Sequence, residues 1–271
     1  MNKVSVITIT FNNAAGLRKT LASVVGQTYT NYEHIVIDGG STDDTLAVIK
    51  EYEHNITYWV SEPDGGIYNA MNKGIAVAKG DYVHFLNGGD AYASDDVLSA
   101  FFSEERSIAF IRGTQICNYG NRTEVWTNLG PRRVTFYDMF VNTMLHQATF
   151  IRTDLFKKYG LYDEALKITS DWVFFFKAIL GGEDTLFIDK PIVDFEMYGL
   201  STNREYGALL KAERFEMIKK LTPPNLYDDY RRMCNQEKDE YIVRFVKSNK
   251  FFVTVFKVFR KLCLSVGIGK E

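Results

Sequence analysis

The sequence has few cysteines and no long apolar run. Its three cysteines are odd in number and lack the paired spacing of a zinc site or a disulfide framework, which favours a reducing, cytoplasmic setting. No stretch of about twenty apolar residues marks a membrane span. The first residues run directly into a strand pattern without the apolar core of a signal peptide. We therefore expect neither a disulfide-stabilised scaffold, nor a leader, nor a membrane-spanning helix.

What the sequence does contain is enough apolar residues for one sizeable core. It has 271 residues, of which 46% are hydrophobic and 24% charged, as in a globular protein. The charge is uneven, because residues 1–204 carry 18 basic and 25 acidic residues whereas residues 205–271 carry 14 basic and 9 acidic ones. These numbers predict a main domain over 1–204 and a basic C-terminal extension over 205–271.

Strand and helix patterns alternate in the amino-terminal part of the chain. Apolar, strand-like runs at 4–10, 35–37, 56–60 and 82–86 are separated by segments with helical spacing of apolar residues. Such alternation is typical of an α/β fold with a mostly parallel sheet flanked by helices. The pattern is less regular in the second half, and it becomes helical from residue 205 onward.

Two of these runs end in isolated acids. The run 34–37 closes on Asp38, and the run 82–86 closes on Asn-Gly-Gly-Asp at 87–90. Ligands of open α/β sheets bind outside the carboxyl ends of the strands. Asp38 and Asp90 are therefore expected to anchor one shared polar site.

Five short blocks follow one another in a fixed order, at 4–12, 37–45, 62–74, 85–90 and 170–171. In this combination they resemble the family 2 glycosyltransferases, inverting sugar-nucleotide enzymes of GT-A fold. The resemblance extends over about residues 3–202. It implies a GT-A type open, mostly parallel sheet flanked by helices, a nucleotide-diphosphate sugar as donor, and a divalent cation, Mn²⁺ or Mg²⁺.

The resemblance places the donor nucleotide at the first two strand tips. Asp38 matches an acid that contacts the uridine moiety, and Thr10 and Phe11 match residues that line the nucleobase pocket. Asp64 matches a donor-site loop acid, and Lys73 could supply a cation to the diphosphate, in a helix that lacks the arginine of many relatives. Plainer interpretations exist: turn acids for Asp38 and Asp64, loop packing for Thr10 and Phe11, and an exposed helix lysine for Lys73.

Residues 87–90 stand where the family has its acidic metal-binding motif, but only Asp90 keeps a carboxylate. One carboxylate suffices in principle, because Mg²⁺ takes one or two acids together with phosphate oxygens and water. The resemblance implies Asp90 as a metal ligand and Asn87 as a ribose contact, with a glycine-rich turn and a solvated acid as the alternative. His146, which opens a segment expected to be a strand over 146–151, is a second candidate metal ligand or else a buried structural histidine.

Asp171 matches the catalytic base of the family and precedes an apolar helix pattern over 172–180. A general base must lie beside the acceptor hydroxyl in its ionised form. The positive end of a helix favours the carboxylate form. A structural role as a helix cap is the alternative, and the two roles can coexist.

Residues 241–270 contain seven basic residues and no acid, interleaved with large apolar side chains. This composition is typical of a basic amphipathic helix that binds an anionic membrane surface. The same apolar residues could instead pack on the main domain or on a second subunit of a homodimer.

Together these features predict a metal-dependent, inverting hexosyltransferase that moves a sugar from a UDP-sugar to a saccharide hydroxyl. The acceptor is expected to be lipid-linked and to serve surface-polysaccharide synthesis, which places the enzyme in the cytoplasm, peripheral to the inner face of the plasma membrane. No nucleic-acid partner is expected. A sugar nucleotidyltransferase is an alternative, although residues 10–13 lack its glycine-rich, basic phosphate loop, and a non-catalytic nucleotide-binding scaffold is another.

Overall fold

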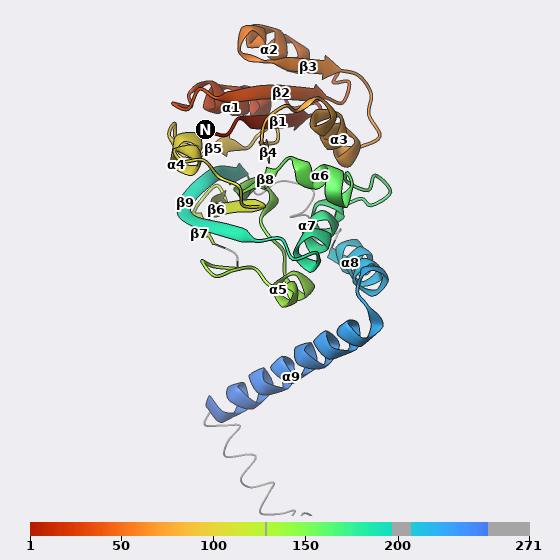
Figure 1. Ribbon diagram of the computed structural model, residues 1–271. Coiled ribbons are helices and arrows are strands. Elements are labelled where there is room, and N and C mark those ends of the chain that lie inside the picture. Colours follow the sequence, from red (N-terminus) through yellow and green to blue (C-terminus); the bar gives the residue numbers. More distant parts are fainter. Residues whose placement is uncertain (128, 197–206, 249–271) are drawn as a thin grey trace, which may run out of the picture. The chain divides into compact units, whose positions relative to one another are not determined.

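A computed structural model describes residues 1–127, 129–196 and 207–248 (Figure 1). The strands are β1 (Val4–Thr10), β2 (Tyr32–Asp38), β3 (Tyr58–Ser61), β4 (Tyr82–Phe85), β5 (Ala91–Tyr92), β6 (Phe110–Asn118), β7 (Thr123–Trp126), β8 (Thr149–Arg152) and β9 (Thr185–Glu196). The α-helices are α1 (Ala14–Val25), α2 (Thr45–Glu51), α3 (Ile67–Val77), α4 (Val97–Phe102), α5 (Phe136–Val141), α6 (Asp154–Tyr159), α7 (Ser170–Leu180), α8 (Gly207–Leu221) and α9 (Pro224–Ser248). The 3-10 helices are η1 (Glu53–Asn55) and η2 (His146–Ala148).

One sheet runs through the main part of the chain in the order β3-β2-β1-β4-β8-β6-β9-β5, with β7 paired to β6. The strands β3, β2, β1 and β4 are parallel, and their register aligns Thr10 with Asp38 and Asp38 with Ser61. β8 joins β4 and β6 antiparallel, β9 joins β6 parallel, and β5 joins β9 antiparallel, so the second half of the sheet is mixed. The predicted α/β fold, an open sheet flanked by helices, is confirmed.

The first half of this sheet follows directly from the sequence. All seven residues of β1 are buried, as expected for a parallel strand covered on both faces. The next helix, α1, begins after Asn13, whose side chain accepts a hydrogen bond from the Gly16 amide. Its residues Leu17 and Leu21 share one face and are buried against the sheet. The buried strand pattern and the helix cap at Asn13 therefore place the end of β1 at Thr10.

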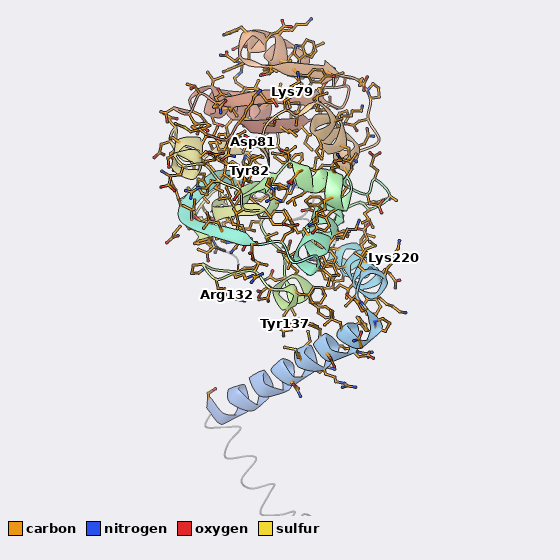
Figure 2. The ribbon with its side chains drawn as sticks, viewed as in Figure 1. Lys79, Asp81, Tyr82, Arg132, Tyr137 and Lys220 are labelled. Carbon is orange, nitrogen blue, oxygen red and sulfur yellow. The ribbon has the colours of Figure 1, made fainter. Side chains whose placement is uncertain are left out.

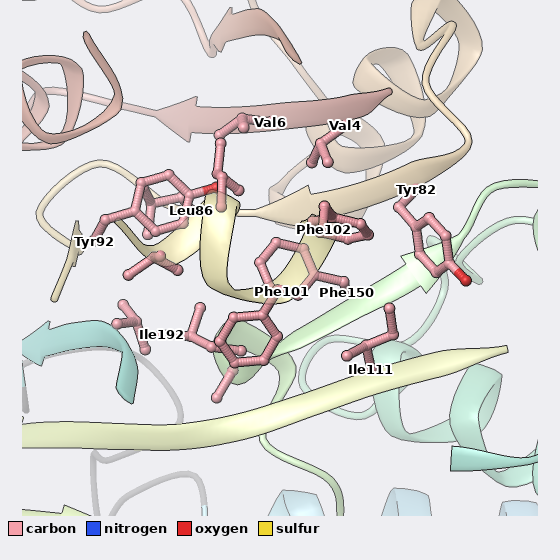
Figure 3. Packing of buried hydrophobic residues seen from close by; sticks show 14 of the residues in the cluster. Val4, Val6, Tyr82, Leu86, Tyr92, Phe101, Phe102, Ile111, Phe150 and Ile192 are labelled. Atoms are coloured by element: carbon pink, nitrogen blue, oxygen red, sulfur yellow. The ribbon is translucent and has the colours of Figure 1, made fainter. Parts of the chain in front are cut away.

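Aromatic side chains fill the space between β4, β8 and α4 (Figure 3). The rings of Tyr82 and Phe102 lie 5.1 Å apart, and Phe102 meets Phe150 edge to face at 5.0 Å. The Tyr82 hydroxyl donates a hydrogen bond to the Ile108 carbonyl at 2.6 Å. Because these residues come from both halves of the sheet, the cluster joins the parallel half to the mixed half.

The amino-terminal ends of β1 and β2 carry a closed polar cluster. The buried Glu33 carboxylate accepts hydrogen bonds from the Ser5 hydroxyl at 2.6 Å, from Lys3 Nζ at 2.7 Å and from the Lys79 amide. Burial alone would raise the pKa of Glu33, but these hydrogen bonds outweigh it and lower the pKa. Figure 2 shows Lys79 and Tyr82 at this end of β4. All these donors belong to the protein, and the acid predicted to anchor the site, Asp38, lies at the opposite end of β2.

The chain divides into two compact units, Met1–Leu221 and Thr222–Glu271. The predicted boundary after residue 204 lies in 197–206, outside the described residues, and α8 belongs to the first unit. In the second unit α9 is one continuous helix, and the basic segment 249–271 lies outside the described residues. Among the helices of the described part, none combines the length and apolar character needed to cross a membrane.

Candidate active site

The carboxyl ends of β1, β2 and β4 meet at one edge of the sheet. The Gly39 amide donates a hydrogen bond to the Thr10 carbonyl at 3.0 Å, and the Gly88 amide donates one to the Ile9 carbonyl at 2.9 Å. These bonds continue the parallel pairing beyond the strands, so the loops after β2 and β4 lie on either side of the β1 tip. The two loops that the sequence assigns to one site are therefore neighbours.

Asp38 is the organising residue of the loop after β2. Its side chain is fully buried, and Oδ2 accepts hydrogen bonds from the Ser41 amide at 3.0 Å and from the Ser61 hydroxyl at 2.6 Å. Oδ1 accepts a hydrogen bond from the Ser41 hydroxyl. All three hydrogen bonds come from the protein itself, so the carboxylate holds its own loop together. The turn-acid interpretation of Asp38 describes this arrangement, and the direct uridine contact stays a prediction.

The solvent-facing side of this sheet edge is formed by Phe11, Gly39 and Asp64. The Phe11 ring is 63% exposed, although it follows a fully buried strand. A Cβ atom on Gly39 would lie 2.8 Å from Asp64 Oδ2 and 3.3 Å from Phe11 Cδ2, so Asp64 and Phe11 both reach the Gly39 backbone. Asp64 Oδ1 accepts a hydrogen bond from the Gly66 amide at 2.8 Å. An exposed ring beside a carboxylate suits a flat group that carries N–H donors, such as a nucleobase.

Two buried oxygens in the same loops lack hydrogen-bond partners within the described residues: Thr10 Oγ1 and Asn87 Oδ1. A Cβ atom on Gly88 would lie 2.9 Å from Thr10 Oγ1, so only glycine lets the two loops approach this closely. A buried polar atom without a partner costs about 1–3 kcal/mol. Both oxygens are therefore candidates for contacts with a bound molecule.

Asp90 ends the loop after β4 and is 5% exposed. The Thr20 hydroxyl of α1 donates a hydrogen bond to the Asp90 carbonyl at 2.6 Å and accepts one from the Gly89 amide at 3.0 Å, which fixes the turn on α1. Within the described residues no three His, Cys, Asp or Glu side chains gather as a complete metal site. Asp90 and the partnerless oxygen of Asn87 fit a hard cation that takes its remaining ligands from phosphate and water.

His146 is part of an aromatic layer and not of this edge loop. It is 6% exposed, its ring stacks on Phe85 with centroids 4.9 Å apart, and Nε2 lies 3.0 Å from the Tyr162 hydroxyl. Burial lowers the pKa of His146, and the charge of Asp171 opposes this effect. The interpretation as a buried structural histidine describes this arrangement, because the ring is packed and hydrogen-bonded inside the protein, and the metal contact stays a prediction. The expected strand also starts later, since 146–148 form a 3-10 turn before β8.

Lys73 is directed toward the loop that precedes α3. Its Nζ lies 2.8 Å from Glu62 Oε1 and 3.5 Å from the Pro63 carbonyl. The ammonium is therefore paired with an acid on the surface. Lys73 is half-buried, with 27% of its side chain exposed, so it is not the exposed helix lysine of the plainer interpretation, and the phosphate contact stays a prediction.

Asp171 lies in the first turn of α7, and the Tyr68 hydroxyl of α3 donates a hydrogen bond to its Oδ1 at 3.0 Å. Burial, and after it the charge of Asp171, raises the pKa of Tyr68 far above its usual range, so Tyr68 stays a protonated donor. The cap of α7 is Thr169 and not Asp171. The cap interpretation of Asp171 is therefore not supported, and its carboxylate lies at the positive end of the helix dipole.

α3 is fastened to the segment that precedes α7. The Asn72 amide group donates to the Tyr162 carbonyl at 2.9 Å and accepts from the Tyr162 amide at 3.0 Å. Asn69 and Asn72 also donate to the two oxygens of Glu164, at 2.9 and 2.8 Å. These contacts fix the helix that carries Tyr68. Sequence analysis did not identify Tyr68, although it lies in a recognised block, because nothing local to a tyrosine in a helix indicates a partner about a hundred residues away.

Comparison with known proteins identifies the family. Residues 5–160 match the family model described as Glycosyl transferase family 2. The chain is 36% identical over 221 residues to an uncharacterized glycosyltransferase of Mycobacterium tuberculosis, covering 76% of this chain and 79% of that protein. It is 32% identical over 176 residues to a PGL/p-HBAD biosynthesis glycosyltransferase of Mycobacterium bovis, covering 63% and 67%. The chain belongs to glycosyltransferase family 2.

Solved structures confirm the GT-A type fold. Staphylococcus aureus TarS in complex with UDP aligns with a TM-score of 0.60 and 24% identity, over 72% of this chain and 60% of that chain. The mannosyltransferase of Pyrobaculum calidifontis in complex with GDP-Man and Mn²⁺ aligns with a TM-score of 0.62 and 16% identity, over 97% and 81%. At these identities the likeness concerns the fold alone.

Proposed function

We propose that this glycosyltransferase is a metal-dependent, inverting hexosyltransferase that moves a sugar from a UDP-sugar to a hydroxyl of a saccharide acceptor. The observation that carries the proposal is the pairing of two features in one compact unit. One is an open edge of strand tips with an exposed ring and partnerless buried oxygens. The other is a carboxylate in the first turn of a helix, oriented by a tyrosine.

The donor nucleotide would lie at the strand tips. Phe11 offers a face on which a base can stack, and Asp64 Oδ2 is the acceptor beside it for a base N–H. Thr10 and Asn87 supply hydrogen-bonding oxygens for the base and ribose. Asp38 acts indirectly, by holding the loop that shapes this pocket.

Asp90 and Asn87 would hold the divalent cation beside the diphosphate, where its charge would stabilise the departing nucleotide. Two observations support this assignment: Asp90 is fixed on the turn by Thr20, and Asn87 Oδ1 has no partner within the described residues. The mannosyltransferase that shares the fold was solved with Mn²⁺.

Asp171 would act as the general base. Its ionised carboxylate takes the proton of the acceptor hydroxyl while that oxygen forms a bond to the anomeric carbon. The bond from this carbon to the diphosphate oxygen breaks, and the electron pair leaves with the nucleotide. Attack from the face opposite the leaving group inverts the configuration. Tyr68, which stays protonated, orients the base through Oδ1.

Transfer assays test this proposal. Incubation with a panel of nucleotide sugars and Mn²⁺ should release UDP from a UDP-hexose, and calorimetry should show UDP binding that a chelator weakens by at least about tenfold. A preference for GDP-sugars would overturn the assignment of UDP-sugar as the donor. Equal UDP affinity with and without chelator would overturn the proposed metal dependence. Family membership supports sugar transfer, so neither a nucleotidyltransferase nor a non-catalytic scaffold is proposed.

We further propose a lipid-linked acceptor and a peripheral position at the inner face of the plasma membrane. The support is the acid-free basic stretch 241–270, most of which lies outside the described residues. The full chain should sediment with anionic vesicles at low salt and be released at high salt. Replacing Lys250, Lys257, Arg260 and Lys261 by glutamate should abolish sedimentation and leave UDP binding unchanged. If sedimentation is unaffected, the alternative of a packing or homodimer element holds.

A further inference from the structure

The helix α8 fastens the segment that precedes Asp171. The Glu213 carboxylate accepts hydrogen bonds from the Lys167 amide at 2.9 Å, from the Ile168 amide at 3.2 Å and from the Thr169 hydroxyl at 2.8 Å. Thr169 is 2% exposed and is the cap residue of α7. One side chain of α8 thus fixes three consecutive residues immediately before the turn that carries Asp171.

The next residue of α8 holds the other side of the same turn. The Arg214 guanidinium lies 4.6 Å from the centroid of the Trp172 ring and donates hydrogen bonds to the Met139 and Asn142 carbonyls. The Trp172 indole N–H donates to the same two carbonyls at 3.1 and 3.0 Å. Asp171 lies between Thr169 and Trp172 in the sequence, so adjacent α8 residues hold the chain on both sides of it.

Electrostatics agree with this placement. Burial lowers the pKa of Arg214 to about 10, and the negative charge of Asp171 opposes the lowering. The Arg214 cation therefore lies within electrostatic reach of the Asp171 carboxylate.

We propose that Glu213 is a positioning residue for Asp171, which fixes residues 167–169 and thereby sets the distance from the carboxylate to the acceptor hydroxyl. The proposal rests on the function proposed above, in which Asp171 is the base. Glu213 itself lies beyond the residues 5–160 that match the family model. Because a misplacement of about 1 Å can cost up to about a hundredfold in rate, loss of this fastening should act on the chemical step.

The test uses the full chain with Glu213→Ala and Glu213→Gln, and Glu216→Ala as the matched control. Glu216 is an exposed acid on the same helix. Three quantities are measured: hydrogen exchange of the amides at 167–171, the Kd for UDP with Mn²⁺, and kcat and KM for sugar transfer.

For Glu213→Ala we expect exchange at 167–171 to rise at least about tenfold, kcat to fall about 10- to 100-fold and the Kd for UDP to stay within about twofold. Glu213→Gln keeps one carbonyl acceptor, so its exchange rate and its kcat should lie between those of Glu213→Ala and the wild type. Glu216→Ala should match the wild type in all three quantities.

Unchanged exchange in Glu213→Ala would show that the fastening does not exist, and faster exchange with wild-type kcat would reduce Glu213 to a structural role. Either result overturns the proposal, as does a loss of UDP binding in parallel with kcat. If Glu213→Ala does not fold, Glu213→Gln carries the same comparison. If the wild type transfers no sugar but exchange at 167–171 responds as expected, the fastening stands and the proposed function fails.

Discussion

Two regions are built in different ways: the strand tips around Asp38 and Asp90, proposed to bind the nucleotide and called the nucleotide edge, and residues 167–171, proposed to carry the catalytic base and called the base turn. At the nucleotide edge, backbone bonds between adjacent strand tips and short loops place the side chains, as in the bond from Gly39 to Thr10. At the base turn, side chains from distant segments do this work: Tyr68 reaches across 103 residues to Asp171, and Glu213 across 44 residues to Thr169. Donor binding and base placement should therefore be separable by mutation.

The largest effect is expected for Asp171→Asn, which removes the base and keeps the shape of the side chain. Transfer should fall about a hundredfold or more, whereas the Kd for UDP should stay within about threefold. Single-turnover kinetics and calorimetry measure the two quantities. Transfer at a near wild-type rate would mean that another group takes the proton.

Asp38→Ala should break the nucleotide edge instead. The change leaves the Ser41 and Ser61 groups without their acceptor, which should lower the free energy of unfolding by about 2 kcal/mol and weaken UDP binding at least about tenfold. Urea unfolding and calorimetry provide the values. Asp44→Ala, at an exposed position that makes no capping hydrogen bond, is the control and should change neither.

A smaller and more local change at the same edge is Gly39→Ala. The new Cβ atom would meet Asp64 Oδ2 at 2.8 Å, so Asp64 must move and UDP affinity should fall about fivefold. The kcat at saturating donor should be unchanged. Gly65→Ala is the matched control, because its Cβ atom would make only ordinary contacts at 3.6 Å. If both variants bind UDP with equal affinity, the nucleobase does not bind beside Asp64.

A change of pH should distinguish the two regions least, because the main effect of acid is on the stability of the whole unit. Burial lowers the pKa of two of its histidines, His34 in β2 and His146. Burial lowers the pKa of His34 to about 3, so between pH 3 and about 6.5 the unfolded chain binds more protons than the native protein. Stability should therefore fall as the pH falls, by about 1 kcal/mol from His34 alone between pH 6.5 and 5.5.

The variant His34→Gln should be less stable at neutral pH but should lose less stability on acidification. His54→Gln, at an exposed position, should keep the wild-type slope. Urea midpoints measured at both pH values give the comparison. An identical slope in His34→Gln and the wild type would show that His34 is not the acid-sensitive group.

This difference in construction also explains which parts the sequence could predict. The strand tips at Asp38 and Asp90 follow from local periodicity and from the rule that parallel strands end at one edge. The same reasoning correctly predicts the α/β fold, and it fails to anticipate the antiparallel pairing of β8, whose partners depend on the packing of the second half.

Residue roles were harder to predict where burial or a partner decides them. Nothing local to His146 indicates that Phe85 and Tyr162 enclose it, and Lys73 offers no sign of its ion pair with Glu62. The charge of residues 205–271 as a whole predicts a C-terminal extension that includes Glu213. Its role follows only from contacts 44 to 46 residues away.

The most direct test of the account is the hydrogen-exchange footprint of UDP in the presence of Mg²⁺. We expect protection in the loops at 10–13, 38–41, 64–66 and 87–90, and none at 167–171, where the base turn is held by the protein alone. Protection concentrated at 167–171, or absent from all of these loops, would contradict the assignment of the strand tips as the donor site.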